Sequence, residues 1–177
     1  MTHPTEITIR LQSVDQILLN PNNPFYSKRL LKEDAEDYII EEASSLHHTT
    51  QIILKVIIPN NETQRTEEII SAIHRHFSNR RQKSSKELKR MLHLGWRSLL
   101  IAFLFLTVMY VLTQIINNIL PKNGFIITIR ESLIILGWVA FWRPAELLLY
   151  EWRPFKRDVN LFDRLEHSNV QVVAEEI

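Results

Sequence analysis

The chain lacks cysteine altogether and has only three glycines among its 177 residues. Without cysteine it can form no disulfide, thiolate zinc site or iron–sulfur cluster. So few glycines argue against a glycine-rich phosphate-binding loop, and the sequence has no P-loop, no G-x-S-x-G and no dinucleotide fingerprint. We therefore expect no cofactor and no enzymatic activity.

Histidines and carboxylates show no pattern of a metal or catalytic site. On a helix, His74 and His76 would point about 160° apart, whereas metal-binding pairs prefer a spacing of four residues. His93 and His167 stand alone in the sequence. A run of acidic residues indicates a solvated helix face rather than acid–base catalysis. These residues are Glu33, Asp34, Glu36, Asp37, Glu41 and Glu42.

The first membrane-spanning segment is expected inside the chain, because the N-terminal MTHPTEITIR lacks the apolar core of a signal peptide. From Ser98 to Pro121 the sequence runs for 24 residues without a charge. A bilayer core needs about 20 apolar residues, so a transmembrane helix is predicted over 99–119. The alternative is a buried core helix, but core helices of this length usually carry a polar stripe, which this segment lacks.

A second apolar segment runs from Phe125 to Tyr150, but charges and Pro144 interrupt it. Spanning 125–142 would place Arg130 and Glu131 inside the membrane, whereas spanning 132–150 would place Arg143 and Glu146 inside it. Proline is well tolerated at the first position of a helix, and the helix dipole favours an acid such as Glu146 in the first turn. We therefore favour a span that ends before Pro144. The predicted segments are an outer turn over 120–124, a second transmembrane helix over 125–142 and an interfacial helix over 144–153.

Basic residues near the span ends determine the expected orientation. They are dense before the first span and recur after the second, whereas the outer turn holds only Lys122. Both termini are therefore expected in the cytoplasm. The cluster before the first span suits anionic lipids of the inner leaflet, and we favour lipid over nucleic acid as its partner. This basic cluster comprises Arg80, Arg81, Lys83, Lys86, Lys89, Arg90 and Arg97.

Polar residues of the two spans are expected to share one depth in the outer half of the bilayer. Arg130 comes level with Gln114 when both are counted from the outer turn. Glu131 comes level with Thr113, and Asn117 lies just outside. An unpaired charge at the membrane centre costs about 2.5–3.5 kcal/mol on insertion scales. This intramembrane polar layer is therefore expected to need a compensating partner.

Three interpretations of the two charges stay open. Arg130 and Glu131 point about 100° apart, and a two-helix hairpin has too little surface to bury both. In a homo-oligomer, Glu131 of one subunit would meet Arg130 of the next. Alternatively, Arg130 snorkels to the outer membrane surface. The third interpretation is a narrow channel, because Glu131 shares one helix face with Ile135, Trp138 and Trp142.

The rest of the sequence predicts a small cytoplasmic α+β domain over residues 1–83. Alternating or β-branched apolar runs are typical of strands, and acids or a capping threonine are typical of helix starts. Strands are expected over Ile7–Leu11 and Gln51–Pro59, and helices over Lys32–Leu46 and from Thr66. Ser84 and Glu87 have capping-box spacing, which predicts a separate amphipathic basic helix over 84–98. The cytoplasmic tail, 154–177, contains a further candidate strand at 169–173.

The tripeptide Trp-Arg-Pro occurs twice, beginning at Trp142 and at Trp152. We interpret each copy as a motif of the membrane–water interface. Its indole lies at headgroup depth, its arginine binds a phosphate or a carboxylate, and its proline changes the direction of the chain. Arg143 and Glu146, three residues apart, can pair along a helix. The residues of this interface motif are Trp138, Trp142, Arg143, Pro144, Glu146, Trp152 and Arg153.

Two blocks of the sequence carry a family resemblance, Ile17–Ala43 and Arg130–Asp158. The second contains Arg-Glu, Gly-Trp-Val-Ala, Trp-Arg-Pro-x-Glu and Tyr-x-Trp-x-Pro in that order. In this the chain resembles a family of uncharacterised bacterial two-span inner-membrane proteins. The resemblance implies a location in the bacterial inner membrane and supplies no activity.

These expectations describe a membrane α-helical hairpin with a small cytoplasmic α+β domain, assembled as a homo-oligomer. Its expected role is that of a structural or interaction protein that couples the cytoplasmic domain to the membrane, and a further protein partner stays open. The alternative is an ion-conducting or transport oligomer that uses the polar layer. A membrane-bound enzyme is a third and weaker reading.

Overall fold

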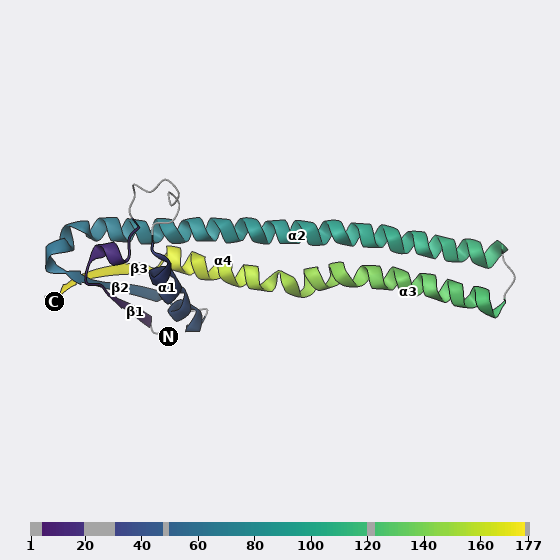
Figure 1. The fold of residues 1–177 in the computed structure, drawn as a ribbon, viewed down its shortest axis with the longest axis horizontal. Coiled ribbons are helices and arrows are strands. Elements are labelled where there is room, and N and C mark those ends of the chain that lie inside the picture. The colour runs from purple at the N-terminus through teal and green to yellow at the C-terminus, as the bar shows by residue number, and fades with distance from the viewer. Residues whose placement is uncertain (1–4, 20–30, 48–49, 120–122, 176–177) are drawn as a thin grey trace. The chain divides into compact units, whose positions relative to one another are not determined.

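The structure is a computed structural model, and it describes residues 5–19, 31–47, 50–119 and 123–175. Its main elements are β1 (Thr5–Arg10), α1 (Glu33–Ser45), β2 (Ile52–Pro59), α2 (Thr66–Ile119), α3 (Gly124–Glu146), α4 (Arg153–Glu166) and β3 (Asn169–Glu175), labelled in Figure 1. The chain divides into two compact units. The sheet unit combines residues 1–85 with 157–177, and the helical unit is residues 86–156.

The sheet has three parallel strands in the order β1-β2-β3. In its register Ile7 pairs with Leu54, and Leu54 pairs with Val170. Parallel neighbours need a crossover connection, so this connectivity is of the α/β kind rather than the α+β kind we expected. The crossover from β2 to β3 contains α2, α3 and α4. The whole helical unit is therefore an insertion between two adjacent strands.

One face of the sheet carries the hydrophobic core. Alternate residues of β2, such as Leu54 and Val56, are fully buried against the helices of the sheet unit. Ile73 and Phe77 of α2 join this core, and Phe77 stacks on Phe162 of α4 with ring centroids 6.4 Å apart. The fold thereby ties α1, the first turns of α2 and the last turns of α4 to one sheet.

Helix α2 is longer than we expected, because it runs unbroken from Thr66 to Ile119. The expected helix start at Ser84 is therefore wrong. Serine has only a modest helix penalty, and its neighbours Lys83 and Lys86 are good helix formers, so a capping-box spacing inside a long helix does not interrupt it. Thr66 begins α2, and its hydroxyl donates to the carbonyl of Thr63 at 2.8 Å.

The expected helix break at Pro144 is also wrong. Helix α3 continues through Pro144 to Glu146 and passes into a π-helical turn, Leu147–Glu151. Proline removes one backbone hydrogen bond, and π-turns often accommodate such local irregularities. Here the Leu147 N–H donates to the carbonyls of both Arg143 and Pro144. The tail beyond contains α4, which we had not foreseen, while β3 occupies the segment where an extra strand was expected.

Two helical segments are long and apolar enough to cross a membrane, by length and composition. One is in α2, and the other lies in the helical stretch that begins at Gly124. In the most apolar windows of these segments only 11% and 6% of the residues are buried. Large side chains such as Leu100 (69%), Leu104 (65%) and Val139 (64%) are mostly exposed. Neither segment is thus buried as a core helix by the part of the chain that the structure describes.

Candidate functional site

Among the residues that the structure describes, one polar contact joins the two apolar helices of the helical unit. The Nη1 atom of Arg130 in α3 donates to the side-chain oxygen of Asn117 in α2 at 2.8 Å. Counting residues from the turn had placed Arg130 level with Gln114, but its side chain extends about one helical turn further toward the connection between the helices. Arg130 therefore points toward the end of the helical unit, in the direction that snorkelling requires.

The other members of the expected polar layer do not join this contact. Thr113 is buried, and its hydroxyl donates to the carbonyl of Met109 in its own helix at 2.9 Å. Gln114 is exposed. Glu131 is also exposed, and it forms no hydrogen bond or ion pair with any residue that the structure describes. The polar groups of this layer are thus only partly connected within one chain.

Glycine allows close helix packing inside the helical unit. Gly137 of α3 is buried, and a Cβ added there would lie 3.6 Å from the Leu106 Cα of α2, at ordinary contact distance. At Gly95 an added Cβ would lie 2.7 Å from Cδ2 of Leu148. The helices of this unit therefore touch through backbone and aliphatic groups, as membrane helices typically do.

Arg143 is the centre of the interface motif. Its Nη1 lies 3.1 Å from Oε2 of Glu146 and 2.7 Å from Oε1 of Glu151. The expected Arg143–Glu146 pair is therefore present, and the π-turn adds a second carboxylate.

The aromatic residues of the interface motif are exposed or lie close to a cation. Trp138 and Trp142 are 65% and 75% exposed on α3. The Arg153 guanidinium lies 5.8 Å from the ring centre of Tyr150, and the Lys156 ammonium lies 5.4 Å from that of Trp152. Cations over aromatic rings at these distances are attracted to the ring faces. The second Trp-Arg-Pro thus combines aromatic rings with positive charge.

The basic cluster divides into two groups. Arg80 pairs with Glu36, and Arg81 pairs with Asp163 and Glu166 of α4 at 2.9 and 2.6 Å. These two arginines thus form ion pairs within the sheet unit, and the lipid contact expected of them stays a prediction. The others are exposed and form no ion pair with the residues that the structure describes. They are Lys83, Lys86, Lys89, Arg90 and Arg97.

The sheet unit contains a buried ionic group that we had not predicted. Glu36 of α1 is fully buried rather than part of a solvated face, whereas the other five carboxylates of that run are exposed. One Glu36 oxygen pairs with Arg80, and the other lies 3.2 Å from Nε2 of His76. Burial raises the pKa of the Glu36 carboxyl, but His76 and Arg80 outweigh it and leave that pKa below its usual 4.5.

Each ring nitrogen of His76 faces a different partner. The backbone N–H of Leu31 donates to Nδ1 at 3.4 Å, so Nε2 carries the proton that faces Glu36. The sequence contained a signal for this group. Glu36 precedes Ile39 and Ala43 at helical spacing, and His76 follows Ile69 by seven residues, so both occupy core-facing positions. This buried group connects α1 to α2.

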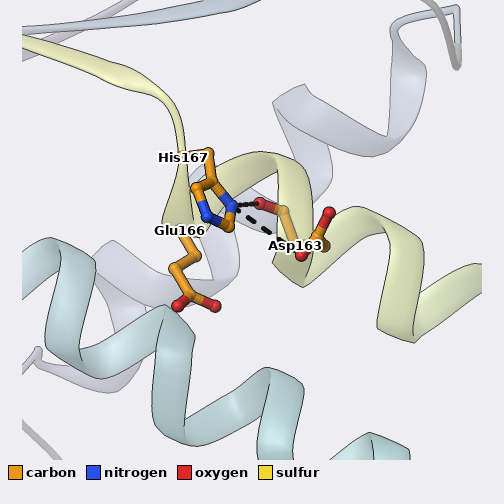
Figure 2. Close-up of side chains that lie close together, drawn as sticks. All are labelled: Asp163, Glu166 and His167. Carbon is orange, nitrogen blue, oxygen red and sulfur yellow. Dashed lines mark hydrogen bonds and ion pairs between the residues drawn. The ribbon is translucent and has the colours of Figure 1, made fainter.

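A third cluster lies at the end of α4. Ligand atoms of Asp163, Glu166 and His167 lie within 4.8 Å of one another (Figure 2). In the figure the His167 ring faces Asp163, whereas Glu166 extends to the other side. Both carboxylates already pair with Arg81, so a metal ion would have to displace this arginine. We therefore assign the cluster to α2–α4 packing.

A shallow pocket of about 320 Å³ lies beside this cluster, lined by Asp163, Arg164 and His167 together with Thr50 and Ile52. It opens at the N-terminal ends of β2 and β3. Open α/β sheets bind ligands at the carboxyl ends of their strands. Arg164 in the pocket is also engaged, donating to the Thr50 carbonyl at 2.8 Å. The pocket therefore gives no support to a ligand site.

No family model, curated protein or solved structure matches the chain. The family resemblance therefore stays a prediction.

Proposed function

We propose that the chain is a two-span protein of the bacterial inner membrane. Its helical unit crosses the bilayer twice, and the sheet unit lies in the cytoplasm with both termini. Its role is structural or interacting: it presents the sheet unit at the membrane surface, in an assembly of several copies. No catalytic step is assigned to it.

The observation that carries this proposal is the order along the chain of the strands that form the sheet. Strands β1 and β2 precede both apolar helices and β3 follows them, yet the three strands form one sheet. Because the chain must return to the side from which it left, the apolar segments between β2 and β3 have to cross the bilayer an even number of times. Two apolar helices satisfy this condition.

The exposure of the apolar side chains supports the same proposal. Soluble monomers rarely expose contiguous apolar patches larger than a few hundred Å², whereas the two apolar helices expose most of their side chains. A bilayer removes this surface from water at a gain of about 25 cal/mol per Å². Exposed lysines and arginines between Lys83 and Arg97 favour a cytoplasmic position for the end of α2 nearer the sheet.

Labelling of single cysteines tests the proposal, since the chain has no cysteine of its own. Gln12→Cys, Gln171→Cys and Asn123→Cys would be expressed separately in bacterial cells and treated with a membrane-impermeant maleimide. Asn123→Cys, between the two apolar helices, is expected to react in intact cells. The other two are expected to react only after permeabilisation. Reaction of Gln12→Cys in intact cells, or recovery of the protein in the soluble fraction, would refute the proposal.

A second candidate is an ion-conducting oligomer. It is favoured by the position of Glu131, an exposed carboxylate in an apolar helix. Planar-bilayer conductance of the purified protein would be compared with that of Glu131→Gln. A current that is smaller in Glu131→Gln than in the unmodified protein would support conduction. The absence of current in both proteins would refute it.

A further inference from the structure

We propose that two copies of this chain associate side by side through α3, with Glu131 of each copy paired to Arg130 of the other. This proposal rests on the proposed function, because it assumes that both copies are inserted in the membrane with the same orientation. It adds the surface, the partner and the charges that hold the two copies together.

The first argument is the unbalanced charge in a single copy. Within the described residues, Arg130 makes one hydrogen bond, to the neutral amide of Asn117, although a guanidinium has five N–H donors. Glu131 is exposed and has no hydrogen bond or ion pair within the described part of the chain. The two charges are adjacent in sequence, so on the helix they point about 100° apart. Each copy therefore presents an arginine and a carboxylate whose charges no residue in its described part neutralises.

The second argument is self-complementarity. Two copies with the same orientation place equal residue numbers at equal depth. Arg130 and Glu131 differ by one residue, a rise of about 1.5 Å along the helix, so each lies level with its opposite charge in the neighbour. A two-fold axis makes the contact reciprocal, giving two identical ion pairs. Lipid tails offer no such counter-charge, and buried charges in membranes typically pair with one another.

The third argument is the rest of the surface on which Glu131 lies. Ile135, Trp138 and Trp142 follow Glu131 at intervals of four, seven and eleven residues, on the same side of the helix. They are 60%, 65% and 75% exposed. Large aromatic side chains often carry much of the binding energy at protein interfaces. The dimer contact would thus combine one charged layer with a stripe of large apolar groups.

Disulfide crosslinking tests the proposed face. Ile134→Cys lies on it, since position 134 is about 40° from Arg130 and about 60° from Glu131 around the helix and is 44% exposed. Leu136→Cys, exposed at 53%, lies about 160° around the helix from position 134 and is the matched control. In membranes of cells expressing the full chain, mild oxidation is expected to give several-fold more crosslinked dimer at position 134 than at 136. Equal crosslinking at both positions, or none at either, would overturn the proposal.

Charge reversal tests the proposed pairing. Arg130→Glu creates two adjacent acids, and Glu131→Arg creates two adjacent bases, so each variant repels its own copies. Each alone, in the Ile134→Cys background, is expected to lose most of the crosslink. Coexpression of the two, with different affinity tags, is expected to restore it between unlike chains. Failure of this rescue would overturn the pairing.

The labelling of Asn123→Cys in intact cells distinguishes the absence of the dimer from a failure of membrane insertion. Normal Asn123→Cys labelling without crosslinking would refute the dimer alone. Absence of that labelling in the chain that carries Asn123→Cys as its single substitution would refute the two-span topology itself.

Discussion

The Nε2 atom of His76 in α2 lies 3.2 Å from Oε2 of Glu36 in α1, and both side chains are almost completely buried. One turn further along α2, Arg80 pairs with the other oxygen of the same carboxylate. A single anion therefore connects two positions of the long helix to α1. Because this group lies where the sheet unit packs against α2, its strength bears on how firmly α2 is held to the sheet.

Glu36→Gln is expected to destabilise the sheet unit by about 2–3 kcal/mol. Removing one partner of a buried ion pair typically costs about 3–5 kcal/mol, and the cost is lower here because the Arg80 side chain is 31% exposed. The measurement is hydrogen exchange of the β2 amides by mass spectrometry, with the full chain in lipid nanodiscs. Glu41→Gln, on the exposed side of α1, is the control and should change the opening free energy by less than about 0.5 kcal/mol. Equal effects of the two substitutions would contradict this account.

The same carboxylate makes the stability of the sheet unit dependent on pH. The pKa of Glu36 in the folded chain lies below its usual value of 4.5. Its contribution is therefore fully present above about pH 4.5 and is lost as the pH falls through the lowered pKa. Protection of the β2 amides, corrected for the intrinsic exchange rate, should fall more steeply between pH 5 and pH 3 in the unmodified chain than in Glu36→Gln. Parallel pH profiles would contradict the assignment.

Periodicity allowed most of the sheet unit to be anticipated. Alternating apolar residues placed β1, and a β-branched apolar run placed β2, within two residues of their observed bounds. The same reasoning misjudged Glu36, because a count of acids along α1 ignored its spacing from Ile39 and Ala43. His76 was compared with His74 rather than with the core positions of its own helix. In both cases the helical period indicates a core-facing position, whereas the polar residue type alone suggests an exposed one.

The helix boundaries could not be read from local signals. Ser84 with Glu87 and Pro144 with Glu146 both have the pattern of a helix start, yet both pairs lie within helices. A cap signal states only that a helix can begin there. Whether it does depends on the preceding turn, and at Pro144 a π-turn beyond the proline kept the helix continuous. The partner of Arg130 could likewise not be read from residue counting. Counting from the turn places Arg130 level with Gln114, but its long side chain extends to Asn117.

Arg143→Ala is expected to disturb membrane topology. The substitution leaves Glu146 and Glu151, both bound to Arg143, without their shared cation at the end of the second apolar segment. It also removes a positive charge that favours a cytoplasmic position. The measurement is maleimide labelling of Asn123→Cys in intact cells, which should decrease. Arg153→Ala is the control, because it removes a nearby charge whose described contact is the Tyr150 ring, and it should have the smaller effect. Normal labelling and assembly of Arg143→Ala would contradict this role.

Substitutions at Gly137 test how closely α2 and α3 pack. An added Cβ would lie 3.6 Å from Leu106, an ordinary contact, so Gly137→Ala should be tolerated and should gain up to about 1 kcal/mol in helix propensity. Gly137→Leu should lose about 1–3 kcal/mol, since a larger side chain must push the helices apart. All four tryptophans lie between residues 86 and 156, so their fluorescence during an SDS titration reports unfolding of the helical unit alone. Gly124→Leu is the matched control, because nothing lies within 4 Å of a Cβ added at Gly124. If Gly124→Leu and Gly137→Leu shift the transition equally, the proximity of Gly137 to Leu106 does not limit the packing.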